Sequence, residues 1–171
     1  MITVQTENIN TLSQKIYDSI IDCIQLHQIT CSCGHSGNVK KWGGYERKVW
    51  FQSEEITLKI QRIRCAHCGK THALLLDILV PYSRVPLDDQ RQIILSCENG
   101  EDCEPVQQSN IFIEDQMVFF IWRKYRRHWK QKLLAARISL TGELSKDCFR
   151  CYSRQFMQIR NTPNLFFSPP T

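Results

Sequence analysis

Two closely spaced pairs of cysteines constrain this sequence more than any other feature. Cys65 and Cys68 have two residues between them and are followed by Gly69, whereas Cys31 and Cys33 are separated by a single residue. Zinc prefers four tetrahedral ligands, and a chain can supply them as two tight turns that each present two thiolates. We therefore expect one structural zinc ion, held by Cys31, Cys33, Cys65 and Cys68.

The short spacing of the first pair leaves an alternative open, in which His35 replaces Cys31 as a ligand. The 31 residues between Cys33 and Cys65 would fit two or three strands, which is the arrangement of a zinc ribbon. Four thiolates leave no open position for water, so such a site stabilises the fold and does not activate a nucleophile. A zinc deaminase would also need a His-x-Glu segment before its cysteine pair, and the sequence has none.

The other cysteines are interpreted as reduced thiols. The chain has nine cysteines, an odd number, and no secretory leader, which argues against a disulfide framework. No apolar run approaches the ~20 residues that cross a bilayer, so we expect a cytoplasmic protein without a membrane partner. Cys148 and Cys151 fit buried core positions of a predicted helix, although with Cys97 and Cys103 they could form a second zinc site.

The hydrophobic pattern predicts an α+β fold in two domains, 1–80 and 81–171. The first would contain an N-terminal helix and a small antiparallel zinc-ribbon sheet, and the second an all-helical, helix-turn-helix-like region. Residues 114–140 contain neither Pro nor Gly and are expected to form one long helix. The other helices expected in this domain span 86–97, 104–110 and 143–160, followed by an extended tail at 161–171.

Local signals in the first domain place its elements. A helix is expected at 11–28, begun by a capping box of Thr11 and Gln14. Short strands are expected between residues 39 and 76, and the Gly43-Gly44 pair is expected to interrupt them.

The long helix carries an unusual charge pattern. Residues 116–140 contain seven Lys or Arg residues and no Asp or Glu. On a helical wheel one arc is apolar, and the cations gather opposite it: Arg123, Arg126, Arg127, Lys130 and Arg137. Solvated helix faces normally mix charges of both signs, so an unmixed cationic face favours an anionic partner, and duplex DNA is a better candidate than a membrane.

The order of the predicted helices is that of a helix-turn-helix, whose last helix enters the major groove by its N-terminal part. In this sequence that part contains Gln116, Phe119, Phe120 and Arg123. Arg126, Arg127 and Lys130 are interpreted as phosphate contacts, and base readout stays open.

Five segments resemble an uncharacterised bacterial family of transposon-associated zinc-ribbon proteins with a helical C-terminal region. They are CSCGHSG (31–37), RCAHCGKTHALL (64–75), VPYS (80–83), RHWK (127–130) and RQFMQI (154–159). The resemblance implies a protein carried by, or derived from, an insertion element, with an N-terminal zinc ribbon and a helical DNA-binding region. It also implies a role beside a separate transposase or integrase, and no known catalysis.

The function expected from the sequence is recognition of element DNA by a non-enzymatic protein without a small-molecule substrate. An autonomous transposase would need a carboxylate cluster on a larger sheet than this chain can form. A second hypothesis is an adaptor whose zinc ribbon docks a transposase or polymerase subunit. A third is RNA binding, with bases stacked on exposed aromatic residues of the ribbon: Trp42, Tyr45, Trp50 and Phe51.

Overall fold

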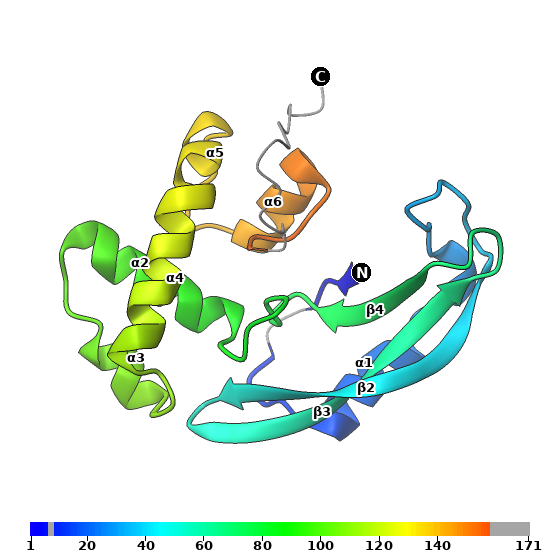
Figure 1. Ribbon diagram of the computed structural model, residues 1–171, viewed down its shortest axis with the longest axis horizontal. Helices are drawn as coiled ribbons and strands as arrows, with labels where there is room; N and C mark the ends of the chain where they lie inside the picture. The colour runs from blue at the N-terminus through cyan, green and yellow to red at the C-terminus, as the bar shows by residue number, and fades with distance from the viewer. Residues whose placement is uncertain (7–8, 158–171) are drawn as a thin grey trace. The chain divides into compact units, whose positions relative to one another are not determined.

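The computed structural model describes residues 1–6 and 9–157 of the 171-residue chain. It has the predicted α+β composition, with a four-stranded sheet and with most helices in the C-terminal half (Figure 1). Contacts divide the chain into two compact units: the first comprises Met1–Val49 and Glu55–Leu76, and the second comprises Trp50–Glu54 and the chain from Asp77 onward.

The first unit is built on a sheet with the strand order β1-β4-β3-β2. Its strands are β1 (Ile2–Val4), β2 (Val39–Phe51), β3 (Glu54–Cys65) and β4 (Thr71–Leu76). The long β2–β3 hairpin turns at Gln52 and Ser53, whose φ angles of 49° and 60° suit a two-residue turn. β4 is antiparallel to β3, whereas β1, which the sequence did not predict, is parallel to β4 with Ile2 opposite Leu74.

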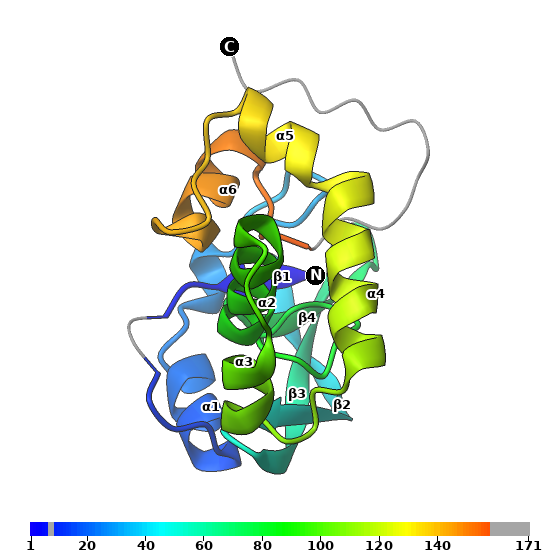
Figure 2. The same cartoon turned by 90° about the vertical axis from the view of Figure 1, so that its left-hand side faces the viewer.

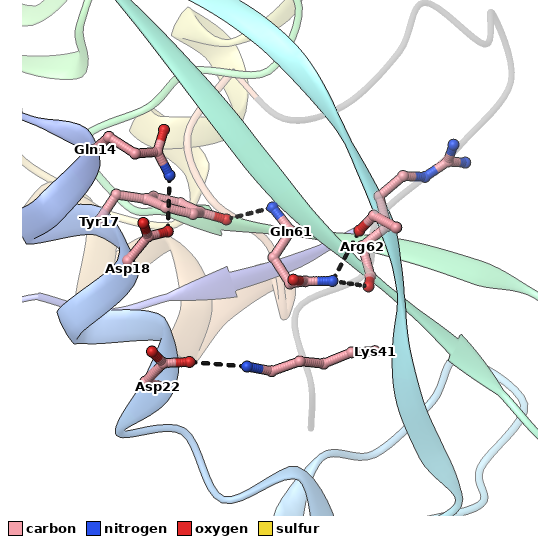
Figure 3. A network of polar contacts seen from close by, with 8 residues as sticks. Gln14, Tyr17, Asp18, Asp22, Lys41, Gln61 and Arg62 are labelled. Carbon is pink, nitrogen blue, oxygen red and sulfur yellow. Dashed lines mark hydrogen bonds and ion pairs between the residues drawn. The ribbon is translucent and has the colours of Figure 1, made fainter.

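The helix α1 (Gln14–Asp22) is anchored to this sheet by Tyr17, which is fully buried. The Tyr17 hydroxyl accepts from the backbone N–H of Gln61 on β3 at 2.9 Å (Figure 3). It also donates to the carbonyl oxygen of Leu74 on β4 at 2.9 Å. One hydroxyl therefore links two neighbouring strands. Asp22, at the end of the helix, pairs with Lys41 of β2 at 2.8 Å.

The capping box predicted for this helix is wrong. Ser13, not Thr11, is the N-cap, and its hydroxyl accepts from the backbone N–H of Ile16 at 3.3 Å. Gln14 bonds to the sheet instead, because its Oε1 accepts from the backbone N–H of Lys59 at 2.6 Å. The helix ends at Asp22, and only a short 3₁₀ turn, Leu26–Gln28, continues the predicted span.

The Gly43-Gly44 pair does not interrupt β2, contrary to the prediction. Gly43 has a φ of +60°, the left-handed value that a bulge residue of the G1 type uses. A Cβ on Gly44 would lie 2.8 Å from the carbonyl oxygen of Ile60 on the neighbouring strand. The pair thus lets β2 and β3 stay closely paired at this point of the hairpin.

The second unit contains five helices in its described residues. They are α2 (Leu87–Asn99), α3 (Glu104–Ser109), α4 (Asp115–His128), α5 (Lys130–Ala135) and α6 (Leu144–Tyr152). The first begins after Pro86 and ends at Gly100 with a φ of +72°, close to the predicted bounds. Within the part of the chain that is described, no helix is both long and apolar enough to cross a membrane.

An aromatic cluster lies within the core of this unit. Trp129 and Phe156 are almost completely buried, with ring centroids 5.2 Å apart. Tyr125 and Tyr152 pack against this pair edge-on. α2 packs against α4, so the buried faces of both helices close over the same core (Figure 2).

The single long helix predicted for 114–140 is wrong in its length. The α-helical pattern is interrupted at Trp129, and α5 ends at Ala135. Arg137 then takes a left-handed φ of 54°, while the N–H of Ile138 reaches the carbonyl oxygen of Leu133 at 2.9 Å. This bond and the left-handed residue belong to a Schellman motif. The sequence does not indicate the motif, because Arg137 occupies the position where a glycine is usual.

The last predicted helix, 143–160, is also shorter in the structure. α6 ends at Tyr152, and Ser153 adopts a left-handed φ of 54°. Residues 158–160 and the tail at 161–171 lie outside the described residues.

Candidate metal centre and nucleic-acid interface

Two tight turns carry the four cysteines of the predicted zinc site. Cys65 is the last residue of β3, and Cys68 lies in the turn that follows. Gly69 in this turn has a φ of +70°, and its N–H donates to the Cys65 carbonyl at 3.0 Å. In the other turn, the N–H of Gly34 donates to the carbonyl of Cys31 at 2.9 Å. In both turns a left-handed glycine follows the second cysteine, because the backbone must reverse there.

The four sulfur atoms form one compact group. All of them lie within 4.8 Å of one another, with 3.6 Å between Cys31 and Cys68 and 3.8 Å between Cys33 and Cys65. In a tetrahedron with metal–sulfur bonds of about 2.3 Å, the sulfurs would be about 3.8 Å apart. These four cysteines could therefore hold one metal ion.

A buried histidine supports this group from outside. His72 on β4 is 6% exposed, and its Nε2 lies 3.2 Å from the sulfur of Cys31. Its Nδ1 lies 3.1 Å from the backbone nitrogen of Met1, a donor, so Nε2 is the ring atom that donates to the sulfur. The cysteine spacing does not indicate His72, because the pairing of β4 with β3, in which His72 lies opposite Ile63, brings it to the cysteines.

The surroundings of Cys31 and Cys68 shift the pKa values of the two thiols in opposite directions. A hydrogen bond with the backbone of Cys33 lowers the pKa of Cys31 to about 5, against the effect of burial and with further help from His72. At Cys68 the backbone of Lys70 lowers the pKa, but burial and hydrogen bonds with the other three cysteines outweigh it and raise the pKa to about 11. Without a metal, Cys31 therefore loses its proton more readily than Cys68. A metal cation bound by the four sulfurs would displace the protons that remain on them.

His35, the alternative ligand, lies beside the sulfur group and not within it. Its Nδ1 is 3.7 Å from the sulfur of Cys33, and its ring stacks on His67 with centroids 3.4 Å apart. Cys33, His35 and His67 form a second set of close potential ligands, more exposed than the first.

The remaining cysteines of the second unit form no such group. Within the described residues, neither set of three or more potential ligands includes Cys97, Cys103, Cys148 or Cys151. Cys148 is fully buried, and burial raises the pKa of its thiol to about 12. This is the core position that the sequence predicted for it. Cys97 and Cys103 lie 3.8 Å apart as free thiols.

The predicted cationic residues have three different environments. Arg123, Arg126 and Arg127 are exposed on α4, and none of them forms an ion pair among the described residues. Lys130 instead pairs with Glu98 of α2 at 2.8 Å, so an acid from another helix neutralises it. Arg137 lies beyond the end of α5 and therefore does not share the face of α4.

Aromatic residues accompany these arginines. Phe119 and Phe120 are 61% and 52% exposed. The guanidinium of Arg123 lies 5.5 Å from the ring centre of Phe119, and that of Arg126 lies 5.7 Å from the ring centre of Trp122. The exposed surface of α4 is thus both cationic and aromatic.

Comparison with known proteins gives one match to a family model, over part of the chain, and no function. A model described as a domain of unknown function (DUF6431) matches residues 30–111. The match contains both cysteine pairs, the β2–β4 strands, α2 and α3, and it ends before α4. No curated protein and no solved structure matches the chain. The expected link to insertion elements therefore stays a prediction.

Proposed function

We propose that this chain is a non-enzymatic DNA-binding protein with one structural zinc ion, and that α4 is its contact with duplex DNA. The observation that carries the proposal is the composition of one exposed stripe of α4. Its members recur at three- and four-residue spacing: Gln116, Phe119, Phe120, Arg123, Arg126 and Arg127. The stripe contains three arginines and no acid, whereas Ile121, Tyr125 and Trp129 on the opposite side are buried.

Zinc is the metal that best suits the cysteine group. Soft thiolate ligands select zinc and similar metals over calcium or magnesium, and the sulfur spacing is that of tetrahedral coordination. A site closed by four thiolates holds the turns of the first unit together and leaves no position for a reacting water. The metal would therefore act on folding.

The arrangement of α2, α3 and α4 supports contact with the major groove. α3 and α4 are joined by a short turn, and α4 packs against α2 through its buried face, as a recognition helix does in a helix-turn-helix. Gln116, Phe119 and Phe120 lie in the N-terminal half, where base edges are read, and Arg126 and Arg127 lie further along, where phosphates are reached.

The test is the salt dependence of duplex binding by the full chain. Each phosphate neutralised by a cation contributes about −0.9 to the slope of log affinity against log salt concentration. Replacing Arg123, Arg126 and Arg127 by Gln should flatten this slope by roughly two to three units and weaken binding at low salt. Fluorescence anisotropy with a labelled duplex measures both quantities.

A charge-matched control separates this effect from a change in net charge. Lys15, Lys146 and Arg150 are exposed cations on α1 and α6, and their replacement by Gln removes the same charge from outside α4. This control should keep most of the slope. If the α4 variant binds duplex DNA with the affinity and slope of the unchanged protein, while its circular dichroism is unaltered, α4 does not bind DNA.

A second candidate function is protein docking, and the exposed apolar residues favour it. Ile111, Phe119 and Phe120 are each more than half exposed near the start of α4. A transposase or integrase could use this surface, in line with the mobile-element context that the sequence resemblance implies. In that case Phe119→Ala and Phe120→Ala would abolish capture of such a partner, and the arginine variant would have little effect on it.

A further inference from the structure

An exposed tryptophan on β2 lies among cations at the metal end of the first unit. Trp42 is 46% exposed, in contrast to the buried Trp129 of the second unit. The guanidinium carbon of Arg64 lies 4.6 Å from the centre of the Trp42 ring, and the Lys40 amine lies 5.9 Å from it. A strand and its neighbour in the sheet thus supply one aromatic ring and two cations to one place.

Hydrogen bonds hold the arginines of this surface in position. The Nε of Arg64 donates to the carbonyl of Gly69 at 3.2 Å, in the turn that also carries Cys68. Arg62, two residues earlier and on the same face of β3, donates to the hydroxyl of Thr71 at 3.0 Å. The turn that carries Cys68 therefore helps to place the Arg64 guanidinium, and β4 helps to place that of Arg62.

The charge around this ring is of one sign. Residues 31–45 and 62–76 contain five Lys or Arg residues and no Asp or Glu. One of the five, Lys41, pairs with Asp22 of α1 (Figure 3). Among the described residues the other four form no ion pair: Lys40, Arg62, Arg64 and Lys70.

We propose that this surface, the Trp42 face (Lys40, Trp42, Arg62 and Arg64), binds single-stranded nucleic acid. Proteins that bind single strands combine aromatic rings, on which unpaired bases stack, with cations that follow the phosphates. A partly exposed indole beside hydrogen-bonded guanidinium groups supplies both. In a duplex the bases are already stacked on one another, so no unpaired base is available to stack on an aromatic ring at the surface of a sheet.

Other aromatic residues of the hairpin do not offer the same surface. Trp50 stacks on Phe112, with ring centroids 5.6 Å apart, and packs against the core of the second unit. Tyr45 is 39% exposed, but it interacts electrostatically with Arg47 and with Tyr17, a buried residue of α1. Trp42 is therefore the exposed aromatic residue that lies beside the cations of the first unit.

The experiment uses the full chain carrying the three α4 substitutions Arg123→Gln, Arg126→Gln and Arg127→Gln, so that binding by α4 does not interfere. Labelled oligothymidine and oligouridine are titrated separately. Trp42→Ala should weaken binding about tenfold or more, because one stacked base is lost, whereas Trp42→Phe should keep most of the affinity. Arg64→Gln should reduce the salt slope by about 0.7.

The controls make the result specific to the Trp42 face. Tyr82→Ala removes another exposed aromatic ring, from the second unit, and should leave binding unchanged. Metal content shows that each variant keeps its fold. The proposal is overturned if Trp42→Ala binds both oligonucleotides like the parent chain, or if the α4 substitutions alone abolish single-strand binding. Duplex binding by the chain with an intact α4 tests the α4 proposal separately.

Discussion

At the scale of single residues, the metal centre can be predicted from the cysteine spacing, but its surroundings cannot. The two cysteine pairs of the sequence contain all four sulfurs that the fold brings together. His72 and His67 carry no spacing signal of this kind, because their contacts with Cys31 and His35 arise from strand pairing and from two turns meeting. Sequence reasoning can find ligands within a turn, whereas groups that support them from other elements depend on the tertiary structure.

The choice between Cys31 and His35 gives a prediction at this scale. Because Cys31 lies in the sulfur group and His35 beside it, Cys31→Ser should reduce bound zinc from about one per chain as strongly as Cys33→Ser does. His35→Ala should keep the metal. Zinc content after gel filtration measures this, and a greater loss in His35→Ala than in Cys31→Ser would mean that His35 is the ligand.

At the scale of elements, breaker residues are a poor guide in this chain. Gly43-Gly44 lies inside a continuous strand, and the helix pattern through Trp129 is interrupted without any glycine or proline. In both places packing determines the backbone conformation. At Gly43-Gly44 the close pairing of the two strands requires glycine, and at Trp129 the interruption of the helix accompanies burial of the largest side chain. The position of α2 was nevertheless predictable, because Pro86 and Gly100 lie at its two ends.

The attachment of α1 to the sheet depends on one hydroxyl. Tyr17→Phe should lower the free energy of unfolding by about 1–3 kcal/mol, because the Gln61 N–H and the Leu74 carbonyl lose their buried partner. Urea unfolding at neutral pH measures the change. The matched control is Gln14→Ala, which removes the exposed hydrogen bond between Gln14 and Lys59 of β3. It should lower the free energy of unfolding by less.

The same hydroxyl makes the unit sensitive to alkali. Burial raises the pKa of Tyr17 to about 12, despite the hydrogen bond with the Gln61 backbone that lowers it. The unfolded state loses this proton near its ordinary value of about 10, so the stability linked to Tyr17 is present below pH 10 and lost as the pH rises to 12. Tyr17→Phe should remove this part of the alkaline loss.

At the scale of the whole molecule, the two units should respond differently to metal removal. The cysteine group belongs to the first unit, while the hydrophobic core of the second contains none of its residues. A strong chelator should therefore abolish the strand contribution to the circular dichroism and leave most of the helical signal near 222 nm. Loss of both signals together, at the same chelator concentration, would contradict this.

The parallel pairing of β1 with β4 has a consequence for the order of folding during synthesis. Ile2 lies opposite Leu74, 72 residues later in the chain. Because β1 leaves the ribosome before β4, its backbone groups lack this partner until β4 has emerged. Contacts between such distant segments form slowly, and an unpaired strand can join another chain meanwhile. A bulky fusion placed directly before β1 would extend this interval and should lower the yield of folded protein more than the same fusion placed after the C-terminus.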